Sequence, residues 1–284
     1  MERLMEERKN EFLTLPDSVI LTTDLQHLPA SEMIVISINS QGLRSLMNEL
    51  KNYPVQNKIF VLCMKGIEIS TGYRLSQIVE ETLPQSKVAV WLGPGHVQDF
   101  YNHIPNCMVI DSNHEELKKQ LVSAFSSDLI RFYYGQDMLG NEIGAAAKNV
   151  IGIAAGMLDG LSLSSLKGAL MSRGTREIAR MIKAMGGNEL SAYGLCHLGD
   201  YEATVFSGHS HNRQFGESFV KGEDFPLLAE GYYTVHALVK LGKEHHTELP
   251  ICDAVYSILY ENQDAKQTLG ALFTRSLKNE FSEL

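Results

Sequence analysis

One lysine lies within the most apolar stretch of this sequence. Residues 139–160 read LGNEIGAAAKNVIGIAAGMLDG, and Lys148 is the only lysine among them. At helical spacing, positions four apart share one face, and that face carries Gly144, Lys148, Gly152 and Gly156. Each glycine costs a helix about 1 kcal/mol relative to alanine. We therefore expect this face to be approached closely, either by another stretch of backbone or by a small ligand.

The Lys148 ammonium has two interpretations on this pattern alone. Lysine is almost never fully buried without a partner, so in a packed helix its side chain would extend to water. Alternatively, the ammonium stays beside the glycines and belongs to a binding or catalytic site. The pattern leaves both interpretations open.

Two further candidates follow expected strands. Lys65 comes directly after the strand-like run 58–64, and Gly93-Pro94-Gly95 follows the run 87–92. Ligands of open α/β sheets bind at the carboxyl ends of parallel strands, where both segments are expected to lie. A lysine that is simply solvated at a strand end is the alternative for Lys65.

The elements that would position these residues change character near residue 135. Before it, short runs rich in β-branched residues alternate with helical patterns, which indicates the second half of a doubly wound parallel sheet. The expected strands are 33–38, 58–64, 87–92 and, more weakly, 107–111 and 129–135, with helices at 42–52, 71–83 and 114–125. After Gly135 every periodic segment is helical. We predict a partial Rossmann-like domain over 1–135 and an all-helical domain over 136–284.

Composition limits the class of protein. The 284 residues carry a formal net charge of −9, with 44% hydrophobic and 21% charged residues. This balance argues against nucleic acid or an anionic membrane surface as the main partner. Four scattered cysteines without a CxxC pair, no metal-ligand spacing and no signal or membrane-spanning run lead us to expect a cytoplasmic protein with free thiols and no membrane insertion.

Four motifs in order carry a family resemblance. They are EIGAAAKNVIGIAAGMLDGL, LKGALMSRGTREIARMIKAMGG, HLGDYEAT and SHNRQFGE. From about residue 8 onward the chain resembles the bacterial NAD(P)-dependent glycerol-3-phosphate dehydrogenases. The resemblance implies an oxidoreductase that interconverts sn-glycerol 3-phosphate and dihydroxyacetone phosphate for glycerophospholipid synthesis. The cofactor would be NAD or NADP, and the substrate a small phosphorylated three-carbon compound.

The resemblance also implies roles for single residues. Lys148 would be the proton donor and acceptor, with Asn149 beside it near the substrate. Lys65 would contact both cofactor and substrate. Asp200 would contact the substrate hydroxyls and face the lysine, and Thr204 would lie in the same pocket. A lysine can serve in this way when burial or a neighbouring charge lowers its pKa.

The phosphate motif departs from the family pattern. Ser210, His211 and Asn212 stand where the family has Ser-Arg-Asn, so a histidine replaces the expected arginine. An imidazole lacks the bidentate fork of arginine and is only partly charged at neutral pH. Arg213 follows directly and could supply the charge instead. Gly93 and Gly95 are expected near the substrate, and His211, Val97 and Glu230 near the cofactor.

The cofactor loop is the main anomaly. No G-x-G-x-x-G occurs in the chain, and the nearest candidate is Gly93-Pro94-Gly95. In the family, a segment like ERKNEFLT follows the first β-α-β unit, so we expect that unit and its Gly-rich turn to be missing. A catalytically impaired binding or regulatory homologue and a related two-domain hydroxy-acid dehydrogenase are therefore alternatives. The cofactor preference and a homodimer stay open.

Overall fold

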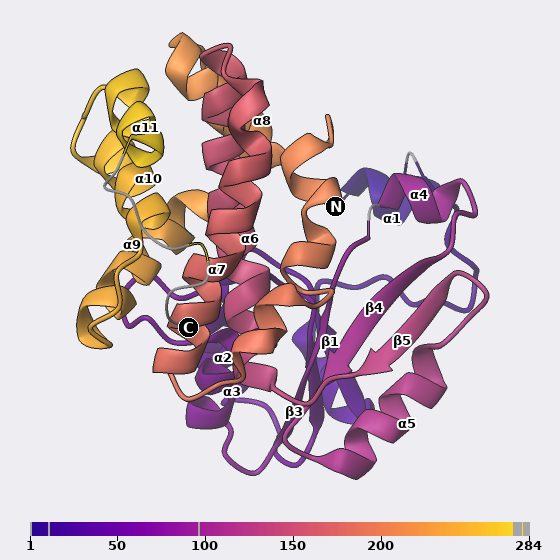
Figure 1. The fold of residues 1–284 in the computed structure, drawn as a ribbon. Helices are drawn as coiled ribbons and strands as arrows, with labels where there is room; N and C mark the ends of the chain where they lie inside the picture. The colour runs from indigo at the N-terminus through magenta and orange to yellow at the C-terminus, as the bar shows by residue number, and fades with distance from the viewer. Residues whose placement is uncertain (1, 11, 96, 275–279, 281–284) are drawn as a thin grey trace.

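A sheet and a group of helices lie side by side in the computed structural model, which describes residues 2–10, 12–95, 97–274 and 280 (Figure 1). The strands are β1 (Met33–Ile36), β2 (Ile59–Leu62), β3 (Lys87–Leu92), β4 (Asn106–Asp111) and β5 (Ile130–Tyr134). They pair in sequence order. The predicted order, a Rossmann-like sheet followed by helices, is confirmed.

The direction of the last two strands differs from the prediction. β1, β2 and β3 are parallel, but β4 runs antiparallel to β3, with Leu92 opposite Val109. β5 is then parallel to β4. Only the short helix α4 (Val97–Tyr101) lies between β3 and β4, whereas a parallel return usually needs a full crossover helix. The amino end of β4 therefore lies beside the carboxyl end of β3.

Helices cover the two faces of the sheet unequally. One face packs on α2 (Leu43–Leu50) and α3 (Leu75–Thr82), with buried residues such as Phe60 and Val90 between them. The other packs on α5 (Glu115–Phe125), which lies across β4 and β5 in Figure 1. β1 is an edge strand, and Val35 on its second face is 47% exposed. The second face is therefore partly exposed over β1, where Met33 still packs against the core on this side.

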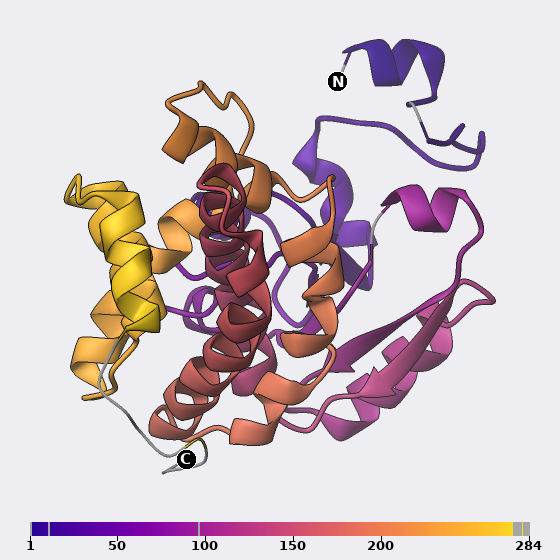
Figure 2. The same ribbon diagram turned by 45° about the horizontal axis from the view of Figure 1, so that its top comes forward.

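The helical half surrounds one long helix, α6 (Met138–Gly160). The side chain of Asp137 caps it by accepting a hydrogen bond from the Gly140 N–H. Around it lie α7 (Lys167–Ala184), α8 (His211–Lys221), α9 (Glu230–Glu244), α10 (Pro250–Tyr260) and α11 (Ala265–Phe273), with short turns of helix at Glu189–Tyr193, Leu198–Asp200 (η5) and Glu202–Phe206. Figures 1 and 2 both show α8 running along α6. The helix expected beyond Phe273 falls partly on 275–279 and 281, which lie outside the described residues.

The segment before β1 contains two short helices. The amino-terminal segment contains α1 (Glu2–Glu7), and a short 3-10 helix (Leu25–Ala30) precedes β1. Within the described ranges, no helix has both the length and the apolarity to cross a bilayer.

Candidate active site

Two strand-end loops meet the helical half at one carboxylate. Lys65 follows β2, and its Nζ lies 2.6 Å from Asp200 Oδ2 in η5. The same ammonium donates to the carbonyl oxygen of Gly93, after β3, at 2.7 Å. Gly93 has φ +120, and a Cβ there would meet the Met108 backbone at 3.2 Å, so only glycine fits this turn without strain. Both predicted strand-end residues therefore lie at one point of the sheet edge.

Lys148 reaches that carboxylate from α6. Its Nζ lies 2.8 Å from Asp200 Oδ2 and donates to Thr204 Oγ1 at 2.7 Å, and Thr204 Oγ1 donates to the Asp200 carbonyl. Only 7% of Lys148 is exposed, so its side chain does not extend to water. Burial, and then the positive charge of Lys65, lower the pKa of Lys148 to about 8, while Asp200 opposes the shift. We call Lys65, Lys148, Asp200 and Thr204 the Lys148 cluster.

One acceptor of the cluster is unused. Asp200 is 1% exposed, and its Oδ1 has no hydrogen-bond partner among the described residues. Buried carboxylate oxygens are normally paired, so an isolated one marks a place for a ligand donor such as a hydroxyl. Two ammonium groups share this single carboxylate, which leaves one positive charge beside it. The arrangement can receive a hydroxyl and favours an anionic molecule.

Three sets of hydrogen bonds hold the elements around the cluster together. Asn149 Nδ2 donates to the carbonyl of Lys65 at 2.9 Å. Asn212 Oδ1 accepts from the Gly231 N–H at 2.8 Å, which holds α8 to the start of α9. The next residue back, Glu230, accepts hydrogen bonds from the backbone N–H and the hydroxyl of Ser40, after β1. Asn149 therefore joins the sheet edge to α6, and Glu230 joins it to α9.

The glycine face of α6 is filled by the chain itself. A Cβ on Gly144 would lie 3.0 Å from His197 Cβ, and one on Gly152 would lie 2.7 Å from Thr204 Cγ2. A Cβ on Gly156 would lie 1.8 Å from the Arg213 carbonyl oxygen. Of the two occupants expected from the pattern, the structure supports another stretch of backbone. The glycines bring residues 197–217 close enough for Asp200 to reach Lys148.

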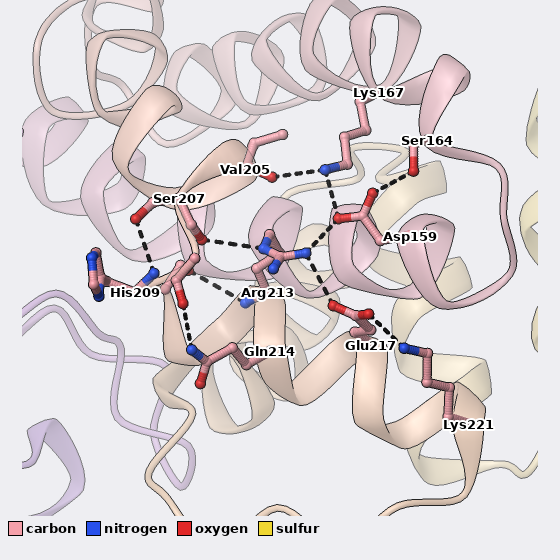
Figure 3. Close-up of polar contacts among 12 residues, drawn as sticks. Asp159, Ser164, Lys167, Val205, Ser207, His209, Arg213, Gln214, Glu217 and Lys221 are labelled. Carbon is pink, nitrogen blue, oxygen red and sulfur yellow. Dashed lines mark hydrogen bonds and ion pairs between the residues drawn. The ribbon is translucent and has the colours of Figure 1, made fainter.

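The phosphate motif is only partly assembled. Ser210 is the N-cap of α8, where its Oγ accepts from the Arg213 N–H, and His211 is exposed with its ring 6.3 Å from that of Phe225. Arg213 points elsewhere, as Figure 3 shows. It donates to Asp159 at 2.6 Å and to Glu217 at 3.1 Å. Two carboxylates, on α6 and α8, hold the Arg213 guanidinium in this structure, so no contact joins it to Ser210, His211 or Asn212.

Those residues form a second ionic group, which we call the Asp159 cluster. Its members are Asp159, Lys167, Arg213, Glu217 and Lys221. It ties α6, α7 and α8 together (Figure 3).

Two expected site residues lie apart from the Lys148 cluster. Gly95 packs on the Phe100 ring, 3.1 Å from where its Cβ would be. Val97 begins α4 and is 54% exposed. Neither contributes a polar side chain, so the structure gives no contact that joins them to Lys148 or Asp200.

Comparison with known proteins agrees with this geometry. A family model described as the NAD-dependent glycerol-3-phosphate dehydrogenase N-terminus matches residues 1–118, and its C-terminal counterpart matches 137–270. The chain belongs to this family. A glycerol-3-phosphate dehydrogenase [NAD(P)+] of Chlorobium phaeobacteroides is 34% identical over 280 residues, which cover 94% of this chain and 84% of that protein. The Clostridium tetani protein of the same name is 33% identical, with 97% and 83% covered.

A solved structure extends the likeness to the fold. The 2.1 Å crystal structure of glycerol-3-phosphate dehydrogenase from Coxiella burnetii superposes with a TM-score of 0.91 at 27% identity. The match covers 96% of this chain and 88% of that one. Like other members of the dehydrogenase family, the chain is an oxidoreductase by descent, and the family's cofactor is NAD(P).

The residues present fit one end of such a cofactor. Ser40, Lys65 and Gly93 end three neighbouring strands, and the unused Asp200 oxygen and the Lys148 ammonium lie beyond them. This edge can accept a nicotinamide beside a small substrate. For the pyrophosphate, the chain offers no G-x-G-x-x-G turn. The residues at this edge therefore fit the nicotinamide end of NAD(P), and no Gly-rich turn is present for the pyrophosphate.

Sequence reasoning missed three residues near the site. Ser40 binds Glu230 and ends β1 in the same way that Lys65 ends β2, so its strand-end position was the available signal. His197 and Tyr201 flank Asp200 and are fully buried. A histidine in the turn-like sequence LCHLGD gave no signal for burial.

Proposed function

We propose that this chain interconverts sn-glycerol 3-phosphate and dihydroxyacetone phosphate with NAD(P)H. The observation that carries the proposal is the Lys148 cluster, in which two lysines share one buried carboxylate whose second oxygen is unpartnered. The nicotinamide supplies the hydride when bound. Relatives named glycerol-3-phosphate dehydrogenase [NAD(P)+] make this substrate the leading choice over other hydroxy acids.

The residues divide the remaining work. In ketone reduction, Lys148 Nζ donates a proton to the oxygen that becomes the alcohol, and in oxidation the neutral amine takes it back. Asp200 Oδ1 accepts a substrate hydroxyl, while Oδ2 holds Lys148 and Lys65 in place. Lys65 adds positive charge next to the developing alkoxide. Asn149 and Thr204 orient these two lysines through the hydrogen bonds that they make.

In this proposal the substrate phosphate binds at the start of α8. The first backbone N–H groups of this 11-residue helix would point toward the phosphate, beside Ser210, His211 and Asn212. His211 is exposed and lacks the bidentate fork of an arginine, so we expect weaker phosphate binding than an arginine would give. Glu230 lies at the cofactor side, where it holds Ser40. Gly93 brings the loop after β3 to Lys65 through its carbonyl oxygen, and Gly95 and Val97 follow it along the chain.

The organisation of the chain forms part of this proposal. We place the boundary between the cofactor domain, 1–135, and the helical domain, 136–284, where β5 ends and α6 follows. Among the described residues, one edge of β1 is unpaired, and Val35 beside it is exposed. We further propose a cytoplasmic enzyme of glycerophospholipid synthesis, and a homodimer formed through the open β1 edge.

The test measures NADH binding and turnover separately. We expect weak NADH binding by fluorescence titration, because the pyrophosphate has no Gly-rich turn. At saturating NADH, the oxidation of NADH should require dihydroxyacetone phosphate and should not occur with unphosphorylated dihydroxyacetone. Turnover with an unphosphorylated 2-oxo acid instead would favour the hydroxy-acid alternative. Binding of dihydroxyacetone phosphate without any turnover would favour a binding or regulatory homologue.

A further inference from the structure

A fully buried histidine lies between α6 and the turn that carries Asp200. His197 is 0% exposed, and its Nδ1 lies 2.8 Å from the carbonyl oxygen of Gly144 on α6. Its Nε2 lies 2.7 Å from the hydroxyl of Tyr201, which is also fully buried. Both ring nitrogens are therefore used, and each one contacts a different element.

The chemistry of the partners assigns the protons. A carbonyl oxygen can only accept, so Nδ1 carries the hydrogen toward Gly144. Burial lowers the pKa of His197 to about 4, although the hydrogen bond to Gly144 opposes the shift. The ring is thus neutral, and Nε2 accepts the Tyr201 O–H. Burial raises the pKa of the Tyr201 hydroxyl, which keeps its proton for this bond.

The position of His197 links it to both partners of the site's ion pair. Gly144 precedes Lys148 by one turn of α6, and His197 Cβ lies only 3.0 Å from where a Gly144 Cβ would be. In η5 the Asp200 N–H donates to the His197 carbonyl at 3.0 Å, and Tyr201 directly follows Asp200. The imidazole therefore joins the Lys148 helix to both sides of the Asp200 turn.

We propose that His197 and Tyr201 are positioning residues that set the distance between the Asp200 carboxylate and the Lys148 ammonium. The consequence for proton transfer rests on the proposed function, whereas the positioning itself can be measured without turnover. The charged groups that face Lys148 are Lys65, from the loop after β2, and Asp200, from η5. Neutral His197 and the Cys196 thiol are the other titratable groups beside it.

The sign of the effect follows from these neighbours. Asp200 favours the charged form of Lys148, while burial and Lys65 favour the neutral amine. If the Asp200 turn moves outward, the carboxylate's contribution weakens and the other two remain. The pKa of Lys148 then falls, and less ammonium is present at neutral pH to donate a proton.

The experiment follows Lys148 directly by NMR, with ¹³C,¹⁵N-labelled lysine in the full chain and the Lys148 signal assigned by its loss in Lys148→Ala. Tyr201→Phe should lower the Lys148 titration midpoint by about 0.5 unit or more, because His197 Nε2 loses its donor and the ring shifts. The matched control is Tyr260→Phe. It removes a hydroxyl that donates to the Tyr232 carbonyl at 2.8 Å, away from the site, and should leave the midpoint unchanged.

A second pair of variants separates positioning from general loosening. His197→Asn keeps an amide N–H that can reach the Gly144 carbonyl and has no tautomer to fix, so it should retain the midpoint, whereas His197→Ala should lower it. In the His197→Asn background, Tyr201→Phe should have no further effect. A midpoint within about 0.2 unit of the parent in Tyr201→Phe, or equal shifts in both tyrosine variants, would overturn the proposal.

Turnover distinguishes this inference from the proposed function. If the parent reduces dihydroxyacetone phosphate, Tyr201→Phe should lower kcat more than it changes KM, since the phosphate contacts are untouched. If the parent shows no turnover, the proposed function fails while the NMR midpoints still decide the positioning role. Should Tyr201→Phe not fold, the comparison of His197→Asn with His197→Ala decides it alone.

Discussion

Two ionic groups lie along the same helix and differ in what they leave unsatisfied. The Lys148 cluster has two cations and one carboxylate, and the Asp159 cluster has three cations and two carboxylates, so each carries one excess positive charge. In the Asp159 cluster every carboxylate oxygen has a partner: Ser164, Lys167 and Arg213 for Asp159, and Arg213 and Lys221 for Glu217. In the Lys148 cluster, Asp200 Oδ1 has none. Net charge therefore does not distinguish the candidate active site from a group of ion pairs that only holds helices together.

Ionisation distinguishes the two groups further. For Asp159, burial opposes ionisation, but the hydrogen bonds from Lys167, Ser164 and Arg213 outweigh it and lower its pKa. For Lys148, burial and Lys65 outweigh Asp200 and bring the pKa to about 8. One cluster stabilises its charges, and the other keeps a proton easy to move. A residue that must exchange protons needs the second arrangement.

Replacing the lysine of the first cluster should give the largest effect. Lys148→Ala should lower turnover of dihydroxyacetone phosphate by about 100- to 10,000-fold, the usual loss when a general acid is removed. The fold should persist, because the variant leaves Asp200 paired with Lys65. Steady-state kinetics and circular dichroism check both parts. Turnover within about threefold of the parent would remove Lys148 from the chemistry.

Replacing Asp159 in the second cluster should lower stability and leave turnover unchanged. Asp159→Asn leaves Lys167 without a counter-charge and Arg213 with Glu217 alone, and we expect a loss of about 2–3 kcal/mol in the free energy of unfolding. Turnover of the folded protein should be unchanged. Because the pKa of Asp159 is lowered on folding, its contribution is present at neutral pH and is lost as the pH falls through the folded-state value.

Denaturant unfolding at pH 7 and at acid pH measures this effect. Lys221→Met is the control within the same cluster, since Lys221 is 40% exposed and should contribute little. A large loss of turnover in Asp159→Asn with normal stability would contradict a structural role for the Asp159 cluster and a catalytic role for the Lys148 cluster.

The pH dependence of turnover sharpens the comparison from the side of ionisation. Ketone reduction needs the Lys148 ammonium, so kcat/KM should fall about tenfold per pH unit above a midpoint near 8. Alcohol oxidation needs the neutral amine and should rise through the same midpoint. Asp200→Asn removes the group that opposes the shift and should move the midpoint lower, whereas Asp159→Asn should leave it in place. Midpoints that move equally in both variants would show that the two clusters are not separate.

The contrast also explains what the sequence could predict. The elements follow local patterns, so the strands and the central helix were predicted within a few residues. The resemblance placed Lys65, Lys148 and Asp200, and the structure brings these three together. The antiparallel direction of β4 depends on how β3 and β4 pack, which no local pattern encodes. Arg213 could not be placed either, because its partner Asp159 is 54 residues away and competes with the phosphate site only in three dimensions.

The smallest expected effect concerns the residue between the two clusters. His211 lies at the start of α8, after the Asp200 turn and before Arg213, and it is exposed. His211→Arg should tighten binding of dihydroxyacetone phosphate at pH 8 by about three- to tenfold, since a guanidinium is charged at this pH and can hold two phosphate oxygens.

Calorimetric titration of the substrate at pH 8 measures the effect of His211→Arg, with His209→Arg as the matched control. The control adds a similar charge two positions away, on the other side of the N-cap Ser210. Tightening in both variants would indicate a general effect of charge at this helix end, whereas tightening in His211→Arg alone would place the guanidinium on the phosphate. An unchanged affinity in His211→Arg would remove this residue from the site. The phosphate would then be held by the backbone N–H groups of α8, because Arg213 remains bound within the Asp159 cluster.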